Sequence, residues 1–408
     1  MVKNNMKVLS ENNRGVVLYA PPIKIGGKYW FSYANRIYSY DEFDMKVTRE
    51  HIFTAPSVRI YPYGYPYCFT ANVGNKIILA PHCARDVAVY DIGTKNMSFF
   101  ELESRNTSSY YRNIAAYGDK VFLLPALQGS DILVLDNLRC IRRIKLANWN
   151  GNIKKSESTS EYVIQGRYLW VTAHYSSQVL KLDMETEKYE LIAIGKDSIG
   201  YTGIALDGEC LWLAESNTGA FVRYDTCNGN TLKFTAPAEL DYNSVEKSYV
   251  HMGLFDFETY IISTPALCNK MTILNKETGK LEILKIDFFD SIIGSKAKYK
   301  FGNYQTSCFG MKVDDKTLWV QRTLDGVIAC INMKDFTYSM FTLELSEEDI
   351  DDICTEIYRL ESEAVSESGP ISLSSFIHFL KETDEDTNRQ SKSHHGVDIW
   401  AAVNRTTH

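Results

Sequence analysis

Three histidines and one glutamate are the residues of this sequence best suited to chemistry. His82, His174, Glu215 and His251 lie in four separate segments, each next to a short apolar run. Imidazoles near a carboxylate can act as general acid and base or hold a divalent metal. The spacing of these four matches no established metal motif, so separate solvated or hydrogen-bonded side chains are the alternative interpretation. Catalysis by this set requires a fold that brings them together.

Tyrosines form a second pattern, most densely in the stretch YPYGYPYC at residues 61–68. One or two tyrosines recur six times, at intervals similar to those of the repeat that organises the chain. They could line a binding surface and offer ring faces and hydroxyls to a sugar, a peptide or a planar small molecule. The alternative is that each ring packs between neighbouring repeats, with its hydroxyl bonded to the backbone. The candidate ligand-binding residues are Tyr63, Tyr65, Tyr67, Arg85, Tyr111, Arg112, Tyr162, Tyr175, Tyr201, Tyr249, Tyr304 and Arg322.

An internal repeat positions both groups of residues. A turn, marked by glycine in five of seven units, leads into a bulky apolar segment such as GNKIILAP or GECLWLAE. A loop and a second segment follow, ending in Asp or Asn, whose side chain suits the next turn. The turns lie roughly 42 to 58 residues apart, close to the length of a propeller blade. The sequence therefore predicts an all-β fold over residues 1–345, a β-propeller of seven four-stranded blades, with six or eight as open alternatives.

The propeller geometry predicts where a site lies. The innermost strand is the first of each blade, so the loops that enter it and the loops between the second and third strands emerge on one face. Function tends to collect on loops held by a rigid scaffold. His82, His174, Glu215 and His251 and the tyrosines all map to this face, around the mouth of the central channel.

The repeat units, for example GRYLWVTAHYSSQVLKLDMETEKYELIAI from residue 166, resemble the seven-bladed propellers of the YVTN, NHL and virginiamycin B lyase kind. The resemblance covers roughly residues 15–345 and implies an architecture, because this fold hosts binders, scaffolds and enzymes alike. No catalytic motif of the lyases aligns residue by residue.

The composition changes after residue 345. Ser346 and Asp349 are spaced as at the start of a helix, and Ile350, Ile353 and Ile357 follow at helical spacing. Residues 346–408 are therefore expected to form a C-terminal helical appendage with a flexible tail. The acids Asp349, Asp351 and Asp352 are expected on a solvated helix face.

The bulk properties limit the partners. The net charge is −7 and no basic stripe is visible, so nucleic acid is not an expected partner. The nine cysteines contain no CxxC pair, which indicates free thiols in a reducing compartment. No apolar run is long enough to span a bilayer, and the start of the chain lacks a signal peptide. We expect a cytoplasmic protein without a membrane partner.

Two functions follow from these patterns. The first is a non-catalytic binding or interaction module, without a cofactor, that uses its tyrosine-rich face to bind a small molecule, sugar, peptide or protein. The second is a lyase or hydrolase in which His82, His174, Glu215 and His251 converge, with a divalent metal as an option.

Overall fold

The computed structural model describes residues 15–54, 66–82, 84, 86–102, 111–125, 131–138, 140–146, 159–195, 200–240, 250–266, 268, 270–289, 307–322, 325–353 and 355. The chain divides into two compact units, Met1–Cys354 and Thr355–His408. The first unit contains all of the strands among the described residues. Most of the predicted C-terminal appendage, including its tail, lies outside the described residues.

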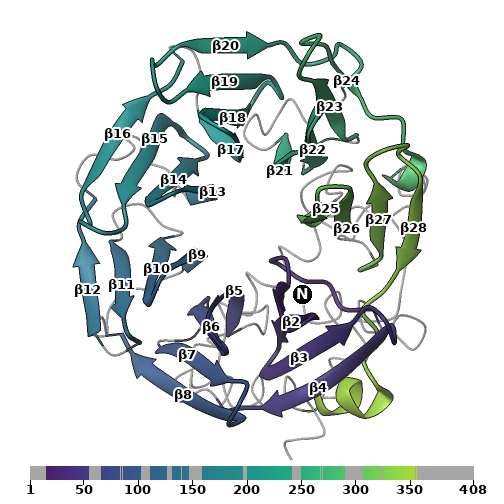
Figure 1. Cartoon of the computed structure of the whole chain (residues 1–408). Coiled ribbons are helices and arrows are strands. Elements are labelled where there is room, and N and C mark those ends of the chain that lie inside the picture. Colours follow the sequence, from purple (N-terminus) through teal and green to yellow (C-terminus); the bar gives the residue numbers. More distant parts are fainter. Residues whose placement is uncertain are drawn as a thin grey trace, which may run out of the picture. The chain divides into compact units, whose positions relative to one another are not determined.

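Seven four-stranded antiparallel sheets form a closed ring around a central channel (Figure 1). Blade 1 consists of β1 (Ile23–Ile25), β2 (Lys28–Tyr33), β3 (Arg36–Asp41) and β4 (Lys46–Ile52). Blade 2 consists of β5 (Tyr67–Val73), β6 (Lys76–Pro81), β7 (Asp86–Asp91) and β8 (Asn96–Glu101). Blade 3 consists of β9 (Tyr111–Tyr117), β10 (Lys120–Pro125), β11 (Ile132–Asp136) and β12 (Cys140–Ile144). Blade 4 consists of β13 (Thr159–Gln165), β14 (Tyr168–Ala173), β15 (Ser176–Asp183) and β16 (Tyr189–Ala193).

The remaining three blades repeat this order. Blade 5 consists of β17 (Tyr201–Asp207), β18 (Cys210–Glu215), β19 (Phe221–Asp225) and β20 (Thr231–Phe234). Blade 6 consists of β21 (His251–Asp256), β22 (Tyr260–Pro265), β23 (Thr272–Asn275) and β24 (Leu281–Ile283), followed by the 3-10 helix η3 (Asp287–Phe289). Blade 7 consists of β25 (Ser307–Asp314), β26 (Thr317–Arg322), β27 (Ile328–Asn332) and β28 (Tyr338–Phe341). The predicted seven-bladed propeller is confirmed.

Burial follows the position of each strand in its blade. The second strands, such as β6 and β18, are buried at almost every residue, because both of their faces pack against neighbouring blades. The outer strands, such as β4 and β8, alternate between partly buried and exposed residues. The apolar segments of the sequence are therefore continuous where the strand is central and alternating where it lies at the rim.

The turns between third and fourth strands show why Asp or Asn ends each unit. The Asp183 carboxylate accepts hydrogen bonds from the backbone N–H groups of Glu185 and Thr186 at 3.0 and 3.1 Å. Asp225 and Asn275 make the same pair of contacts in blades 5 and 6. The predicted role of this side chain in the turn is confirmed.

Each blade is built from four consecutive strands, so the first and last blades are joined by contacts of the segments that flank them. Two such contacts are present, one from the segment before blade 1 and one from the segment after blade 7. The segment before blade 1 reaches blade 7, where the Val16 N–H donates to the Leu343 carbonyl at 3.0 Å. The buried Gln321 side chain of β26 holds the same segment, accepting from the Leu18 N–H at 2.8 Å and donating to the Val16 carbonyl at 2.7 Å. The predicted first strand of blade 1 is correspondingly short, since only residues 23–25 pair with β2.

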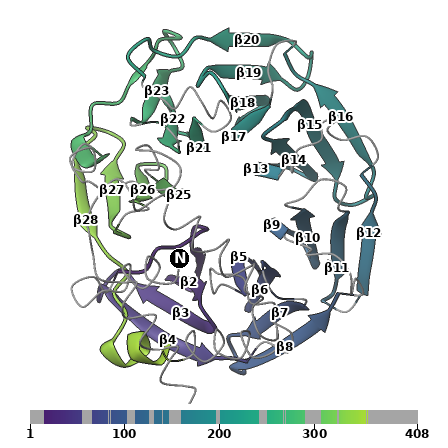
Figure 2. The same ribbon diagram turned by 180° about the vertical axis from the view of Figure 1, so that it is seen from behind.

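The second crossed contact runs from the segment after blade 7 to blade 1. Ser346 begins a helix over residues 347–353, since its hydroxyl accepts from the Asp349 N–H at 3.1 Å. Figures 1 and 2 both show this helix beside β4. Asp349 is almost buried there and pairs with Arg49. The expectation of a solvated acidic face is therefore wrong for Asp349, because blade 1 offers the arginines that its carboxylate needs.

Candidate functional site

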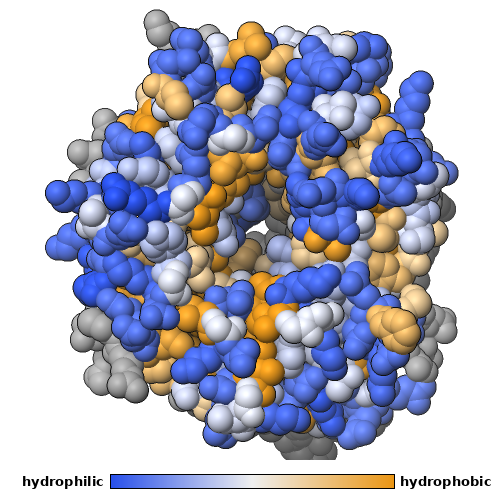
Figure 3. Space-filling model, in the orientation of Figure 1, coloured by the Kyte–Doolittle hydropathy of each residue, from blue (hydrophilic) through white to orange (hydrophobic). Residues whose placement is uncertain are grey.

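The channel mouth is formed where the inner strands begin. As predicted, the loops after the second strands lie against these starting points: the His82 N–H donates to the Pro66 carbonyl at 2.8 Å, and the Ser216 N–H to the Gly200 carbonyl at 2.9 Å. Figure 3 shows the ring hollowed at its centre, with hydrophobic residues bordering the opening and hydrophilic residues over much of the remaining surface. A ligand in the opening therefore meets side chains at the start of the inner strands.

The tyrosines at these starting points pack between blades. Tyr67, Tyr111 and Tyr201 are between 0 and 3% exposed. The Tyr67 hydroxyl donates to the Asp86 carboxylate at 2.8 Å, and the Tyr162 hydroxyl donates to the Ile114 carbonyl of the preceding blade at 2.7 Å. The Tyr201 hydroxyl donates to the Ile194 carbonyl. These contacts correspond to the packing interpretation; ligand binding by these tyrosines stays a prediction.

A β-bulge follows the buried first residue in most blades. The register between the inner strand and its partner shifts at Tyr67/Phe69, Tyr201/Gly203 and His251/Gly253, and in β25 between Ser307 and Phe309. The same shift occurs around Arg112 in β9 and before Tyr162 in β13. Bulges redirect side chains and are frequent beside active sites. They place Cys68, Arg112, Thr202 and Met252 at equivalent bulge positions of blades 2, 3, 5 and 6. In blade 4 the bulge contains Ser160 and Glu161, which together lie opposite Thr172.

Electrostatic interactions connect three titratable side chains of blades 2, 3 and 4. Arg112 lies within electrostatic range of both His82 and Glu161, and all three are partly exposed. Burial raises the pKa of Glu161 to about 7, although the nearby Arg112 opposes this shift. Burial and Arg112 together lower the pKa of His82. We call His82, Arg112 and Glu161 the charged sector.

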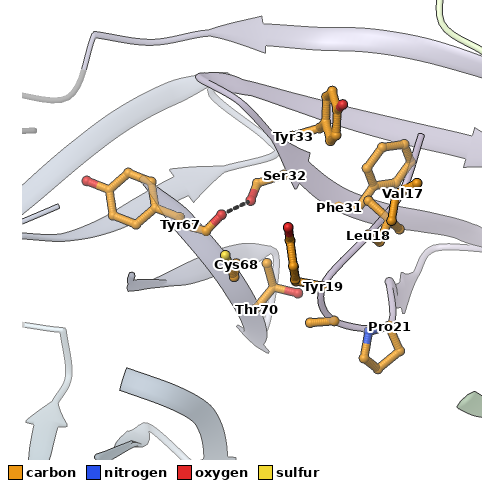
Figure 4. Close-up of a pocket in the computed structure, with 11 residues that line it drawn as sticks. Val17, Leu18, Tyr19, Pro21, Phe31, Ser32, Tyr33, Tyr67, Cys68 and Thr70 are labelled. Carbon is orange, nitrogen blue, oxygen red and sulfur yellow. Dashed lines mark hydrogen bonds between the residues drawn. The ribbon is translucent and has the colours of Figure 1, made fainter. Parts of the chain in front are cut away.

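A hollow lies next to the charged sector, between blades 1 and 2 (Figure 4). It is shallow and open to solvent, and it is lined in part by Tyr19, Ser32, Cys68 and Thr70. Figure 4 shows the Tyr19 ring between the Ser32 and Thr70 side chains, whereas the Tyr67 ring points away. Tyr19 is 51% exposed, and Cys68 occupies the same bulge position as Arg112 in the next blade. The hollow therefore continues the wall of the charged sector.

Glu215 is engaged away from the channel. Its carboxylate is 3% exposed and accepts two hydrogen bonds from the Lys233 ammonium at 2.7 and 2.8 Å. Lys233 belongs to β20, the outermost strand of blade 5, so the carboxylate points outward across the sheet. The ion pair accounts for this buried charge.

His174 and His251 are both buried at contacts between blades. The His251 ring lies edge-on against Phe221 with 5.7 Å between ring centroids, and its Nε2 is 3.2 Å from the Gly219 carbonyl. Burial lowers the pKa of His251 to about 4, and its Nδ1 has no hydrogen-bond partner among the described residues. The His174 carbonyl accepts from the Ser216 hydroxyl at 2.8 Å. Catalysis by the predicted set of four stays a prediction.

Arg322 and Tyr175, two further candidates, lie in the same layer of loops. The Arg322 guanidinium donates to Asp325 at 3.1 Å and to the Phe288 carbonyl at 2.9 Å, and it lies over the Phe288 ring. It therefore anchors η3. Tyr175 is partly exposed and packs against the His174 ring with 6.2 Å between centroids. The candidates Tyr63, Tyr65, Arg85, Tyr249 and Tyr304 lie outside the described residues.

The described residues contain no group of three or more His, Cys, Asp or Glu side chains that could hold a metal ion. In the same part of the chain, no helix is long and apolar enough to cross a membrane.

Sequence reasoning missed Glu161 and the importance of the position beside each tyrosine. The recurring tyrosine drew attention, but it is the buried partner of the pair. The residue after it, displaced by the bulge, is Cys68, Arg112 or Thr202 in blades 2, 3 and 5. In blade 4, Glu161 precedes Tyr162 and lies within the bulge between Thr159 and Tyr162. Among these four blades, a charged residue lies within the bulge in blades 3 and 4.

Comparisons with known proteins identify the fold. No family model and no curated protein sequence matches the chain. Its structure is similar to a catalytically inactive variant of virginiamycin B lyase from Staphylococcus aureus with quinupristin, at 16% identity and a TM-score of 0.56, covering 77% of this chain and 94% of that one. It is also similar to a chain of the mitotic checkpoint complex, at 9% identity and a TM-score of 0.52, covering 82% and 90%. A 6-phosphogluconolactonase described as putative, from Bacteroides fragilis, shares 11% identity with a TM-score of 0.51, covering 80% and 97%. Similarity at this level shows the propeller fold, which serves enzymes and assemblies alike.

Proposed function

We propose that the protein is a non-catalytic binding propeller that holds a small molecule, sugar or short peptide at its channel mouth. The observation that supports the proposal is the charged sector, in which Arg112 of blade 3 lies within electrostatic range of His82 of blade 2 and Glu161 of blade 4. A few convergent polar groups beside a partly apolar hollow are typical of small-ligand sites. The free thiols among the described cysteines suit a cytoplasmic location.

The charge at this position supports binding rather than stability. A carboxyl whose burial raises its pKa to about 7 lowers the stability of the folded protein when it is ionised. Such groups cluster at functional sites. Glu161 thus differs from Glu215, whose charge is offset by Lys233. The buried tyrosines support the proposal indirectly, because they fix the start of each inner strand and so the position of its bulge.

An acid–base enzyme of the lyase or hydrolase type is the second candidate. One observation favours it: Glu161 and His82 flank Arg112, and a carboxyl that titrates near neutrality can both give and take a proton. This arrangement differs from the predicted set, of which it retains only His82.

Capture of ligands from a metabolite extract tests both candidates. The purified protein is incubated with the extract, recovered by gel filtration, and its retained compounds are identified by mass spectrometry. We expect the wild type and the R167A variant to retain the same compound and the R112A variant to lose it. Arg167 is a matched control because it pairs with Asp183 in blade 4, outside the charged sector. Retention that is unaffected by R112A contradicts the proposed site, and conversion of the compound favours the enzyme.

A further inference from the structure

We infer that the inner edge of β2 binds an extended peptide, which pairs with the backbone of Ser32 in the hollow between blades 1 and 2. This inference goes beyond the proposed function, because the hollow is a site separate from the charged sector. The peptide takes the place that an inner strand fills in most other blades.

The inner strand of blade 1 is short. β1 pairs with β2 only from Ile23 opposite Trp30 to Ile25 opposite Lys28. In five other blades the inner strand also pairs with the fifth residue of the second strand, the position of Ser32 in blade 1. These residues are Ala80, Leu124, Ala214, Thr264 and Gln321. A strand residue therefore covers this position in five blades, whereas β1 does not reach it in blade 1.

Two prolines account for this gap. Continuation of the β1 register places Pro22 opposite Phe31 and Pro21 opposite Ser32. A proline has no N–H to donate, so it cannot continue the ladder of hydrogen bonds. The preceding segment turns instead to blade 7, where the Gln321 side chain holds it. Figure 4 shows the Pro21 ring set apart from Ser32.

The Ser32 backbone faces the gap. The turns at both ends of β2 contain two residues, so Lys28 and Tyr33 close their hairpins by hydrogen bonds. Alternation along β2 then directs the N–H and carbonyl of Ser32 away from β3 and toward the gap. Within the described part of the chain neither group makes a hydrogen bond, although Ser32 is only 8% exposed. Backbone groups this well buried normally have a partner, which a ligand backbone can supply.

The surroundings of Ser32 suit a peptide. The Ser32 hydroxyl donates to the Tyr67 carbonyl at 3.1 Å, which fixes the edge of β2 against blade 2. The lining of the hollow combines the apolar side chains of Leu18 and Phe31 with the Thr70 hydroxyl and the half-exposed Tyr19 ring (Figure 4). One residue of an extended peptide offers an N–H and a carbonyl on the same edge, at the spacing of an antiparallel pair. It can therefore exchange two hydrogen bonds with Ser32.

Binding of capped peptides to a proline variant tests this inference. The probe is a pool of acetylated and amidated pentapeptides whose three central residues are randomised. Members retained by the wild type are identified by mass spectrometry and resynthesised for calorimetry. We expect S32P to bind them at least tenfold more weakly, because proline removes the N–H that donates to the peptide and places its ring in the gap. S32A is the matched control, since it loses the same hydroxyl but keeps the backbone N–H, and it should bind within twofold of the wild type.

A methylation scan of the peptide gives a second measurement on the unaltered protein, which stays decisive if S32P does not fold. N-methylation of the residue opposite Ser32 should weaken binding about tenfold, because it removes the N–H that donates to the Ser32 carbonyl. N-methylation of each adjacent residue should change binding less than twofold, because the N–H groups of adjacent residues point to the other edge of the strand. Equal sensitivity at consecutive residues, or insensitivity at all of them, overturns the strand geometry.

The R112A variant separates this site from the charged sector. It should bind the capped peptides as the wild type does. Absence of any retained peptide, or equal binding by S32P and the wild type, overturns the inference. If R112A still loses a compound of the metabolite extract in that case, the proposed function stands without the peptide site. Loss of peptide binding in R112A but not in S32P would place the peptide at the charged sector and also overturn the inference.

Discussion

The Arg49 guanidinium donates a 2.6 Å hydrogen bond to the Asp349 carboxylate, which lies 300 positions later in the chain. Asp352 accepts from the same guanidinium at 3.2 Å, and the nearly buried Arg36 approaches both acids. The contact ties the helix after blade 7 to blade 1. Together with the Gln321 contacts on the other side, it joins the two ends of the ring, which share no strand within the described part of the chain.

Replacement of Asp349 by asparagine should lower the free energy of unfolding by about 2 kcal/mol. The value lies between those of exposed and fully buried ion pairs, because the Asp349 side chain is 8% exposed and that of Arg49 26%. Urea unfolding followed by tryptophan fluorescence measures it. E348Q is the control, since Glu348 contacts the same arginine but its side chain is 76% exposed. Equal effects of the two variants would show that the burial of Asp349 does not matter.

Replacement of Gln321 by leucine should destabilise the other closing contact by about 3 kcal/mol, because three backbone groups lose their partner in a buried site. These are the Leu18 N–H and the Val16 and Gly326 carbonyls, at 2.7 to 2.9 Å. Hydrogen exchange should rise at residues 16–18 before it rises in the blades. Q165L is the matched control, because Gln165 also bridges two blades but is partly exposed. Unchanged hydrogen exchange at residues 16–18 in Q321L would show that Gln321 does not hold this segment on blade 7.

The fold was largely predictable because each blade repeats one pattern of burial. Two apolar segments, a glycine turn and a terminal Asp or Asn recur whatever the function, since every blade must pack against the next. The ring closure was not predictable from that pattern. No pattern in the sequence indicates that Asp349 contacts Arg49, and a run of acids at a helix start is usually solvated.

The site was only partly predictable, for a related reason. His82 and Arg112 were selected because their loops map to the channel mouth, and the structure places both there. Glu161 was missed because its exposure depends on a bulge, which inserts a residue between Thr159 and Tyr162 and is invisible in the periodicity. His251 and Glu215 were selected by chemical type, but whether a histidine faces a channel or a neighbouring blade depends on the register of its strand.

Burial of His251 should make the free energy of unfolding decrease as the pH falls. Its pKa is lowered to about 4 in the folded protein, below its usual value of 6.5, so the unfolded chain binds the proton more readily between these values. The stabilisation is complete above pH 6.5 and is lost as the pH falls towards 4, by about 3 kcal/mol in all. The H251Q variant should lack this loss when unfolding free energies at pH 7 and pH 4.5 are compared. H51Q should change the difference less, because His51 is only partly buried. If H251Q loses as much unfolding free energy between pH 7 and pH 4.5 as the wild type, groups other than His251 cause the loss.

Glu161 should show the opposite dependence, and its cost to stability connects the fold with the proposed site. Burial raises its pKa from 4.5 to about 7, so the folded protein binds the proton more tightly than the unfolded chain. The destabilisation of the folded protein by ionised Glu161 is absent below pH 4.5. It grows as the pH rises from 4.5 to 7 and is complete above pH 7. Because the side chain is partly exposed, we expect E161Q to be more stable than the wild type by about 1–2 kcal/mol at pH 8 and equal to it near pH 4.5. E190Q, on the outer strand of the same blade, should change neither value. A stabilised variant that has lost its ligand is the result expected of a carboxylate kept for binding; an unchanged or lower stability at pH 8 would show that Glu161 is a structural residue.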